Sequence, residues 1–368
     1  MDKIKELALH ITGRVIVISD IHGEIELFKE LLKKAEFCRD DILIINGDLC
    51  EKGSNSKVVV RYIMELCAAN PNVHVTEGNC DALVDHLLKE NPQLLNYLTS
   101  QEHTLFKEWL EEAGYRLENY VTIQEVKEVL LRHYSNELEW LTSLPTAIET
   151  DRYIFVHAGL EDRDDWKETE RGNAISMPSF LQKSHRAGKY VIVGHWPVVN
   201  YSTEIPSDNP IIDEAKKIIA IDGGNVIKPT GQLNAFIIER RTEGDSFSHV
   251  YVDKLPTKTV ATAFKADPEM KGAINYPFYT ILQVQKGDFF TLCSQPETGR
   301  LLQVKNEYIK QNENGDFTVK TDVSCSQISV NKGEAVSMID ENCSGYALIK
   351  KEGTTGWIPR ECLEQSHL

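Results

Sequence analysis

The sequence has no excess of basic residues and no long apolar run. Its 368 residues include 40 lysines and arginines against 56 aspartates and glutamates, which gives a formal net charge of −16. This balance excludes the basic footprint that binding to a nucleic-acid backbone needs. No apolar stretch is long enough to span a bilayer, so we expect no membrane segment.

The sequence also has no C-x-x-C motif, although it contains eight cysteines. Scattered cysteines of this kind are typical of a cytoplasmic protein with reduced and mostly buried thiols. The first residues show no hydrophobic core followed by small residues, so no signal peptide is expected. The chain is longer than a single hydrophobic core usually organises, which favours two domains.

The strongest local pattern is Arg14–Glu24, which reads RVIVISDIHGE. The β-branched run Val15–Ile18 predicts a buried strand, and Asp20 and His22 follow in the turn at its C-terminal end. In an open α/β sheet, ligands bind at that edge. An aspartate and a histidine from one tight turn can ligate one metal ion. The stretch therefore predicts a metal-binding turn.

The same pattern recurs along the chain, because further apolar runs end in polar residues flanked by glycine. These runs and residues are Ile42–Ile45 with Asp48, Val73–Thr76 with Asn79, Tyr153–Val156 with His157, Tyr190–Val193 with His195, and Ile218–Ile221 with Asp222. Carboxylate, amide and imidazole groups that gather at strand ends are typical of a two-metal site.

The order D-x-H-G, G-D, G-N, H-A-G and G-H resembles that of the calcineurin-like metallophosphoesterases. Leu141–Pro145, which leads into YIFVHAGL, and Gly194–Pro197 are similar to the phosphoprotein-phosphatase branch and its bacterial diadenosine-tetraphosphatase relatives. The resemblance extends over roughly Arg14 to Glu239. It implies a four-layer α/β/β/α sandwich that hydrolyses phosphoesters.

The resemblance also implies a ligand set for two divalent ions. It assigns Asp20 and His22 to a first ion and Asp48 to a bridging position. It assigns three residues to the second ion: Asn79, His157 and His195. A metal-bridging hydroxide would then attack phosphorus in line. Mixed oxygen and nitrogen ligands suit manganese, iron or zinc better than calcium. Asp222 is expected to support a ligand rather than to be one.

The departures from the family pattern concern substrate contacts and proton transfer. Lys52 stands where the phosphatase branch has an arginine, so it keeps the charge but loses the bidentate geometry. Cys80 stands where the branch has the histidine that resembles a leaving-group acid, and a thiol is a weak donor. Glu51 and Asp81 are acidic, like the residues that accompany the replaced arginine and histidine in the family pattern. Arg171 matches the other phosphate-contacting arginine weakly.

These comparisons define the predicted site residues. The predicted catalytic residues are Asp48, Lys52, Cys80 and Asp81, and the predicted substrate-binding residues are Lys52, Asn79 and Arg171. Because the histidine that resembles the leaving-group acid is missing, we expect esters with good leaving groups to be hydrolysed faster than alkyl monoesters. The G-N-C-D motif also occurs in small bacterial phosphodiesterases, but the second histidine of their G-H-x-H motif is absent here, where Trp196 and Pro197 follow His195.

Two helices are predicted between the first three strands. Gly23–Phe37 and Ser54–Ala69 have apolar residues at helical spacing, and a serine N-cap begins the second. With the strands they predict a right-handed parallel βαβαβ unit. Asp85–Glu139 is rich in Leu, Glu and Lys and is broken at Pro92. It predicts a helical insert, either an ordinary layer on the sheet or a cap over the site.

The composition changes twice after these helices. Glu161–Gly188 is polar and irregular and forms a second candidate lid, and residues 189–253 are β-rich, as expected for the second sheet. The catalytic domain is therefore predicted over residues 1–254. Residues 255–275 lose periodicity and gather Pro, Thr and Lys, which predicts a linker. Residues 276–368 form a β-rich C-terminal region.

Within that region, residues from about 317 to 368 resemble a bacterial Src-homology-3-like barrel, and the sequence Gly356–Pro359 carries the resemblance. Such barrels bind peptides or cell-wall material, or pack against their own catalytic domain. Trp357 has few aromatic neighbours in the sequence, so a structural or regulatory role is favoured. Residues 276–308 form a second small β unit or an extension of the barrel.

Three functions stay open at this point. The favoured one is a metal-dependent serine/threonine-phosphatase-like phosphomonoesterase acting on phosphoprotein. The second is a phosphodiesterase or dinucleoside polyphosphate hydrolase acting on a small phosphoester. The third is a metal-binding scaffold with weak catalysis that works through the C-terminal barrel. In all three, neither nucleic acid nor membrane is an expected partner.

Overall fold

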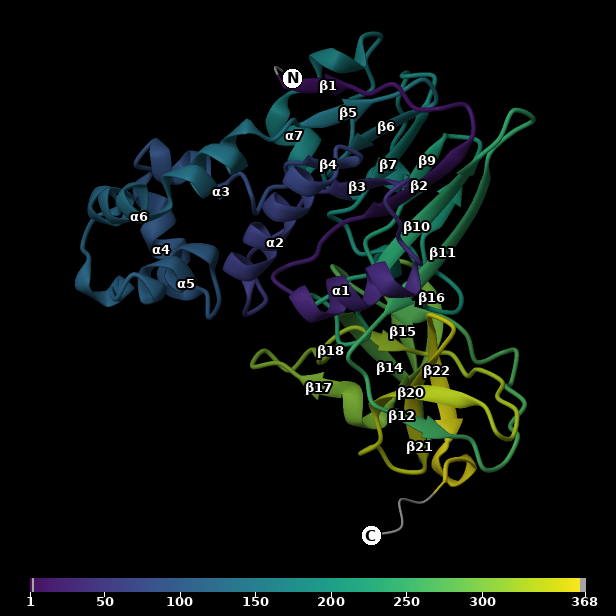
Figure 1. Ribbon diagram of the computed structural model, residues 1–368. Coiled ribbons are helices and arrows are strands. Elements are labelled where there is room, and N and C mark those ends of the chain that lie inside the picture. The colour runs from purple at the N-terminus through teal and green to yellow at the C-terminus, as the bar shows by residue number, and fades with distance from the viewer. Residues whose placement is uncertain (2, 365–368) are drawn as a thin grey trace. The chain divides into compact units, whose positions relative to one another are not determined.

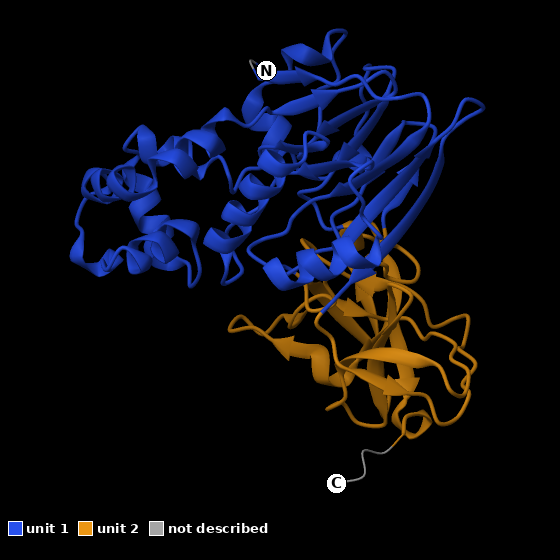
Figure 2. Ribbon diagram, viewed as in Figure 1, with its two compact units in different colours: residues 1–197, 210–227, 232–253 blue, residues 198–209, 228–231, 254–368 orange. Residues whose placement is uncertain are grey.

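The computed structural model describes residues 1 and 3–364, and the chain divides into two compact units (Figure 2). Unit 1 comprises residues 1–197, 210–227 and 232–253. Unit 2 comprises residues 198–209, 228–231 and 254–368. Residues 365–368, which end the predicted barrel, lie outside the described residues.

A five-stranded sheet in unit 1 contains the first three predicted strands (Figure 1). Its order is β11-β10-β2-β3-β4, and β2, β3 and β4 run parallel to one another. The central strands are buried on both faces, which explains their continuous apolar runs. The strands are β2 (Gly13–Ile18), β3 (Ile42–Asn46), β4 (Val73–Thr76), β10 (Leu233–Arg240) and β11 (Ser246–Val252).

A six-stranded sheet in unit 1 contains the other three predicted strands. Its order is β1-β5-β6-β7-β9-β8, and β6, β7 and β9 are parallel neighbours. Their carboxyl ends therefore meet at one edge of this sheet. The strands are β1 (Ile4–Glu6), β5 (Ala147–Glu149), β6 (Tyr153–Val156), β7 (Tyr190–Val193), β8 (Ile211–Asp213) and β9 (Ile218–Ala220).

The two sheets share a buried core. Val15 and Val17 of β2 pack there with Phe155 and Ile192 of the other sheet. Ile16, which points to the opposite face of β2, belongs to a second cluster with the helices. Both faces of β2 are thus covered, one by a sheet and one by helices. The predicted α/β architecture with two packed sheets is confirmed.

The predicted helices between the strands are present as α1 (Ile25–Lys34) and α2 (Ser56–Ala69). The predicted serine N-cap of the second helix is wrong, because Asn55 is the N-cap and its side chain makes no capping bond. The backbone N–H groups of Ser56 and Lys57 instead donate to the Glu108 carboxylate, each at 2.9 Å. An acidic group from another helix thus satisfies this N-terminus.

The helical insert forms a group of its own beside the first sheet (Figure 1). Its core contains Trp109, which is fully buried and stacks on Tyr134 with ring centroids 5.0 Å apart. Thr122 and Glu125 form a capping box at the start of the last helix. The helices are α3 (Leu83–Leu88), α4 (Pro92–Ser100), α5 (Leu105–Glu112) and α6 (Ile123–Ser143).

One prediction about the second half of unit 1 is wrong. Residues 189–253 do not all belong to the second sheet, because β10 pairs antiparallel with β2 and β11 pairs with β10. β10 is buried along almost its whole length, so its pattern fits the centre of either sheet and does not identify its partner. The candidate lid region holds α7 (Arg171–Ser176) and two 3₁₀ turns, η2 (Trp166–Glu168) and η3 (Phe180–Gln182).

The described part of unit 2 is all-β apart from short 3₁₀ turns. Its larger sheets have the orders β16-β15-β14-β18-β17 and β12-β20-β21-β22, and β13 pairs with β19. The first group of strands is β12 (Thr257–Thr259), β13 (Ala273–Ile274), β14 (Thr280–Lys286), β15 (Phe290–Gln295) and β16 (Arg300–Lys305). The second is β17 (Ile309–Gln311), β18 (Phe317–Val319), β19 (Val323–Ser324), β20 (Ala335–Asp340), β21 (Tyr346–Lys351) and β22 (Thr354–Pro359).

The stretch that the sequence predicts as a linker, residues 255–275, contributes β12 and β13 to unit 2. Strands this short carry no readable periodicity, which explains the prediction. Trp357 is fully buried, and its ring N–H donates to the Ser324 carbonyl at 2.7 Å. Trp357 is therefore part of the core of this unit. Among the described helices, none combines the length and the apolar character needed to cross a bilayer.

Candidate metal centre

The predicted ligands of the first sheet come together at its carboxyl edge. Asp20 and His22 follow β2, Asp48 follows β3 and Asn79 follows β4. These parallel strands end side by side. Two backbone bonds join their turns: the Asp20 N–H donates to the Gly47 carbonyl at 3.1 Å, and the His22 N–H donates to the Asp48 carbonyl at 3.0 Å.

The second sheet supplies the two remaining predicted ligands. His157 follows β6 and His195 follows β7, and their ring centroids are 5.2 Å apart. His157 Nε2 lies 3.4 Å from Asp48 Oδ1. The His195 backbone N–H donates to the Asp20 carboxylate oxygens at 3.2 and 3.1 Å. Residues from both sheets therefore meet in one place.

Several of these residues have a left-handed backbone. The φ angles are 56° at Asp20, 48° at His22, 52° at Asp48 and 65° at His195. Each such conformation costs a side chain about 1–3 kcal/mol and persists only where surrounding contacts enforce it. Strain of this kind gathers at functional sites. In this backbone conformation the polar side chains of the four residues lie close to one another.

Two glycines next to the ligands are required for close approach. A Cβ at Gly78 would lie 2.2 Å from Asp48 Oδ1. A Cβ at Gly194 would lie 2.2 Å from Asp20 Oδ2. Any side chain at either position would displace a carboxylate, which explains the glycine in the G-N and G-H motifs.

One group of ligand atoms surrounds a point between the sheets. Atoms of Asp48, His157 and His195 all lie within 4.8 Å of one another. His157 Nδ1 bonds the Asn46 carbonyl at 2.9 Å and therefore carries the proton, which leaves a lone pair on Nε2. The Asn79 oxygen lies 3.3 Å from that Nε2 and 2.8 Å from His195 Nδ1.

This arrangement at Asn79 fits a cation. Its oxygen faces acceptors, and turning the amide would let its nitrogen donate to both rings instead. The orientation with the oxygen inward is the one that a metal ion requires, because lone pairs then converge from an amide, a carboxylate and two imidazoles. The residues therefore fit a bound metal.

A second group of ligand atoms shares the same carboxylate. His22, Asp48 and Cys80 have ligand atoms within 4.8 Å of one another. His22 Nδ1 lies 3.2 Å from the Cys50 carbonyl, which leaves Nε2 to face the carboxylates. That Nε2 lies 3.9 Å from Asp20 Oδ1 and 3.9 Å from Asp48 Oδ2. Asp48 therefore faces both groups.

The electrostatics of the site call for positive charge. Burial raises the pKa of Asp20, and the neighbouring Asp48 raises it further. Burial also raises the pKa of Asp222, with a contribution from Asp20. Burial works against the ionised Asp48 too, but His157 and His22 hold its pKa well below the usual range. Burial opposes the charged form of His157, yet Asp48 raises the pKa of this ring to about 10. Buried carboxylates this close need compensating cations.

Comparison with known proteins agrees with this geometry. A family model described as calcineurin-like phosphoesterase matches residues 13–221, more than half of the chain. The chain belongs to the calcineurin-like phosphoesterase family. Membership of this family implies a dinuclear metal site, and the two groups of candidate ligand atoms lie where that site is expected. A model described as variant SH3 domain matches residues 301–365, so unit 2 contains an SH3-like domain.

Two curated relatives represent different activities within this family. The chain is 30% identical over 130 residues to the symmetrical bis(5'-nucleosyl)-tetraphosphatase of Buchnera aphidicola, a match that covers 33% of this chain and 44% of that protein. It is 25% identical over 160 residues to Shewanella-like protein phosphatase 1 of Plasmodium berghei, which covers 40% of this chain and 39% of that protein. The chain therefore spans less than half the length of each.

A solved structure of a protein serine/threonine phosphatase from Saccharomyces cerevisiae is also similar. The match covers 69% of this chain and 85% of that chain. Its sequence identity is 13% and its TM-score is 0.42. The family assignment therefore rests on the sequence match to residues 13–221.

Within the candidate metal centre, Asp81 holds the turns that carry the candidate ligands. Its carboxylate accepts backbone N–H groups from Asp48 at 2.8 Å, Leu49 at 2.9 Å and Gly78 at 2.9 Å. The Cys50 thiol also lies 3.4 Å from it. Asp81 is therefore a positioning residue in this structure, and its catalytic role stays a prediction.

The turn after Asp48 connects the candidate metal centre to the helical insert. The Glu51 carboxylate accepts the Tyr97 hydroxyl at 2.9 Å and the Leu105 backbone N–H at 2.9 Å. Burial raises the pKa of Glu51 to about 7. Lys52 Nζ lies 3.5 Å from Gln101 Oε1 and 5.7 Å from the centre of the Tyr97 ring. The sequence did not identify these partners of Glu51, because the contacts join segments far apart in the chain.

Arg171, at the start of α7, is held by two carboxylates. It forms a bidentate pair with Glu77 at 2.7 and 2.5 Å and bonds Asp85 at 2.5 Å. These bonds raise the pKa of Arg171 further above its usual value. A phosphate contact by this guanidinium would compete with both carboxylates, and its substrate role stays a prediction.

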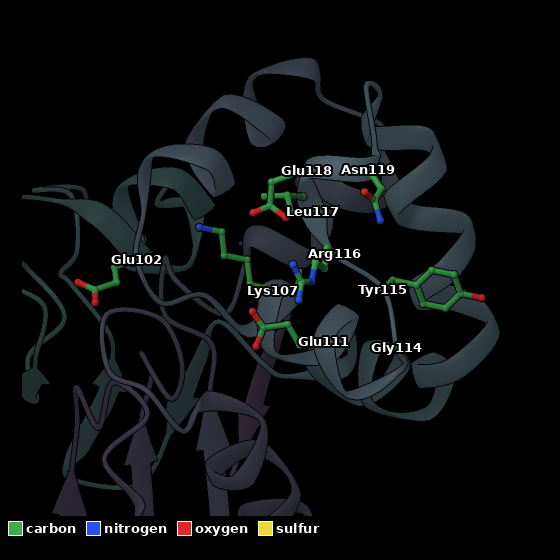
Figure 3. A pocket seen from close by; sticks show the side chains of 9 residues that line it. All are labelled: Glu102, Lys107, Glu111, Gly114, Tyr115, Arg116, Leu117, Glu118 and Asn119. Atoms are coloured by element: carbon green, nitrogen blue, oxygen red, sulfur yellow. The ribbon is translucent and has the colours of Figure 1, made fainter.

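Two cavities lie near these elements. One of about 290 Å³ lies between α3 and α7, and its lining includes Ala82, Lys89 and Ile175. The Ile175 carbonyl lies 3.2 Å from the Asn79 amide, which places this cavity beside the metal ligands. Figure 3 shows the other, of about 780 Å³, inside the helical insert, and none of the predicted ligands lines it.

Sequence reasoning missed Asn46, which joins the two sheets behind the ligands. Its amide donates to the carbonyls of Val156 at 3.0 Å and Ile192 at 3.1 Å, and its oxygen accepts the Thr76 hydroxyl at 2.9 Å. Its carbonyl also fixes the His157 ring. A polar residue at the end of an apolar strand was the available signal.

Proposed function

We propose that this phosphoesterase is a serine/threonine-phosphatase-like phosphomonoesterase that acts on phosphorylated protein at a two-metal centre. The observation that carries the proposal is the convergence of two groups of ligand atoms on one carboxylate, Asp48. A carboxylate that two ions share would hold them close together, and two such ions stabilise the attacking and leaving oxygens of an in-line displacement at phosphorus. The relative from Plasmodium berghei, described as a protein phosphatase, supports the substrate class.

The chain's own residues would hold the ions in two sets that share Asp48. The first set is Asp20, His22 and Asp48, and the second is Asp48, Asn79, His157 and His195. Two divalent ions in such a site supply Lewis acidity and a water of lowered pKa. The oxygen and nitrogen donors suit manganese, iron or zinc.

The residues around the ions would bind and orient the phosphate. Lys52 follows Asp48 in the same turn, and its contacts with Gln101 and Tyr97 are weak ones that a phosphoryl oxygen can replace. A lysine offers a point charge rather than a bidentate fork, so it would bind phosphate without fixing its rotation. Asp81 keeps the Asp48 turn in place through three backbone bonds.

Proton delivery to the leaving group is the weak point of the site. Burial and the nearby Asp48 raise the pKa of the Cys80 thiol well above its usual value, and a thiol is a poor hydrogen-bond donor. A well-placed general acid is typically worth about 10²–10⁴-fold. We therefore infer that aryl phosphates are hydrolysed faster than alkyl phosphates.

A second candidate function is hydrolysis of a small phosphodiester or a dinucleoside polyphosphate. The cavity of about 290 Å³ beside the ligands supports it, because Ala82 and Ile175 offer an apolar lining and Lys89 adds a positive charge. That combination suits the organic group of a small phosphoester. The relative from Buchnera aphidicola, described as a tetraphosphatase, supports the same candidate.

The first experiment compares p-nitrophenyl phosphate with bis-p-nitrophenyl phosphate in the presence of manganese. Asp48→Asn is the blank, and Asp164→Asn, the same change at an exposed position, is the matched control. A monoester-dominated rate that only Asp48→Asn abolishes supports the phosphomonoesterase. A diester-dominated rate supports the second candidate instead. No rate above the blank contradicts both and leaves the scaffold role.

A further inference from the structure

The second group of ligand atoms, from His22, Asp48 and Cys80, contains a sulfur. Cys80 Sγ lies within 4.8 Å of both a His22 ring nitrogen and an Asp48 oxygen. The residue is 6% exposed, in the turn after β4. A buried sulfur that shares a small space with an imidazole and a carboxylate has the surroundings of a metal ligand rather than those of an ordinary core thiol.

The backbone fixes Cys80 in this position. Its N–H donates to Asp48 Oδ1 at 2.8 Å, so the carboxylate shared by the two groups also holds the cysteine. The Asn79 side-chain nitrogen lies 3.5 Å from Sγ, on the side away from the amide oxygen that faces the histidines. Asn79 and Cys80 are consecutive residues, and this turn presents them to different ligand groups.

The other group is already complete without sulfur. It draws on four residues: Asp48, Asn79, His157 and His195. The group around His22 has only Asp20 and Asp48 beside the imidazole. A fourth donor is needed there to reach the coordination number that zinc adopts in proteins, and Cys80 is the residue whose ligand atom stands with His22 and Asp48.

We propose that the Cys80 thiolate is a ligand of the ion that His22 and Asp48 hold. This inference rests on the two-metal centre of the proposed function. On binding, the S–H bond of Cys80 breaks, its proton passes to solvent, and a sulfur–metal bond forms. Because a thiolate is a soft ligand, this position selects zinc or iron over manganese or magnesium. The other position, with oxygen and nitrogen donors only, accepts the harder ions.

The ligand role also explains how the site differs from one with a general acid. A thiolate engaged with an ion delivers no proton to the leaving group. The preference for good leaving groups then follows from the position of the sulfur as well as from its weak acidity. The two ions also differ chemically, because only one of them has a sulfur ligand.

Cobalt(II) substitution tests the proposal in the full-length protein without relying on turnover. We expect wild-type protein with two bound cobalt ions to show a near-ultraviolet sulfur-to-cobalt charge-transfer band. Cys80→Ser should lose that band. The visible bands of the cobalt ion in the other position, which Asp48, Asn79, His157 and His195 would hold, should remain. Cys50→Ser is the matched control, because Cys50 is the neighbouring buried thiol, and it should keep the band.

Zinc X-ray absorption of the wild-type protein gives a readout that needs no variant. We expect a sulfur shell at about 2.3 Å, the usual zinc–sulfur distance. In chelator competition, Cys80→Ser should lower the affinity for one of the two ions by at least roughly 10–100-fold. That is the range for losing a residue that only supports a metal ligand. The other ion should keep its affinity.

Each outcome decides the matter. Two bound cobalt ions without a sulfur band in wild-type protein overturn the ligand role and leave the proposed function standing. A band that persists in Cys80→Ser, or that disappears in Cys50→Ser, also overturns it. If the protein binds no cobalt or zinc at all, both the ligand role and the two-metal centre are wrong.

Discussion

The two units treat buried charge differently. In unit 2, Lys350 is almost fully buried, and it donates to the Thr230 carbonyl at 2.6 Å with the Asp208 carboxylate at 3.7 Å. In unit 1, Asp20 and Asp48 are equally buried, yet their ion pairs in the described part of the chain are with histidines only. Unit 2 thus carries its own counter-charge, whereas unit 1 leaves that task to a ligand.

A second buried lysine in unit 2 follows the same rule. Lys305 pairs with Glu307 at 2.6 Å, donates to the Phe289 carbonyl at 3.2 Å and lies 6.0 Å from the centre of the Trp357 ring. The carboxylate that neutralises its charge therefore comes from the same unit. The comparison teaches that a buried charge by itself does not mark a site. The mark is a group of like charges without a fixed counter-charge.

The largest effect expected from this comparison is at Asp208. Asp208→Asn removes the Asp208 carboxylate from beside the buried Lys350 charge, and breaking a buried ion pair costs about 3–5 kcal/mol of unfolding free energy. Urea unfolding measures this loss. Hydrolysis of p-nitrophenyl phosphate by the folded variant should be unchanged. Asp316→Asn, at an exposed position of unit 2, is the control, and an unshifted Asp208→Asn midpoint would contradict the structural role of the pair.

Removing metal should act on unit 1 alone. At an ion concentration 100 times Kd, binding stabilises the folded state by about 2.7 kcal/mol, and a chelator abolishes this. Hydrogen–deuterium exchange should therefore speed up at the carboxyl ends of β2, β3 and β4 and stay constant in β20–β22. Equal protection of the metal turns with and without chelator would count against a bound ion.

Arg171 offers a case of internal pairing within unit 1. Burial alone would raise the pKa of Glu77, but its bonds to Arg171 lower it. The pair's contribution is therefore present above the ordinary glutamate pKa of about 4.3 and is lost as the pH falls through the lower folded pKa. We expect Arg171→Met to cost about 2 kcal/mol at pH 7. The difference from wild type should shrink in acid.

Urea titrations at several pH values measure this dependence. The control is Arg163→Met, which removes an exposed pair with Glu161. A raised KM for phosphomonoesters in Arg171→Met, beyond the effect on stability, would support the predicted substrate contact. An unchanged KM would mean that Arg171 serves only its internal ion pairs, as Lys305 and Lys350 do in unit 2.

The smallest expected effect is at Cys80. Cys80→His supplies an imidazole that can protonate a leaving group, so the rate on a phosphoserine peptide should rise by about 10-fold relative to p-nitrophenyl phosphate. Steady-state kinetics on the two substrates give the ratio. Cys67→His, which places the same side chain away from the site, is the control. A ratio that stays constant would mean that leaving-group protonation does not limit the reaction.

Much of the fold was predictable because its signals are local. The β-branched run Val15–Ile18 and its counterparts specify buried strands, and the helical spacing of apolar residues specifies α1 and α2. Predictions failed where the decision depended on pairing between distant segments. The assignment of β10 to the wrong sheet is one example, because a strand buried on both faces fits next to any buried neighbour.

The order of chemical groups along the chain, by itself, determined the family and indicated which residues are candidate ligands. Only the tertiary structure decided what each polar group faces. It set Glu51 against the helical insert, Arg171 against Glu77, and Cys80 beside His22 and Asp48. The physical reason is that a strand and its turn are specified by neighbours in sequence. The partner of a buried charge is specified by whichever distant segment the packed core brings within a few ångströms.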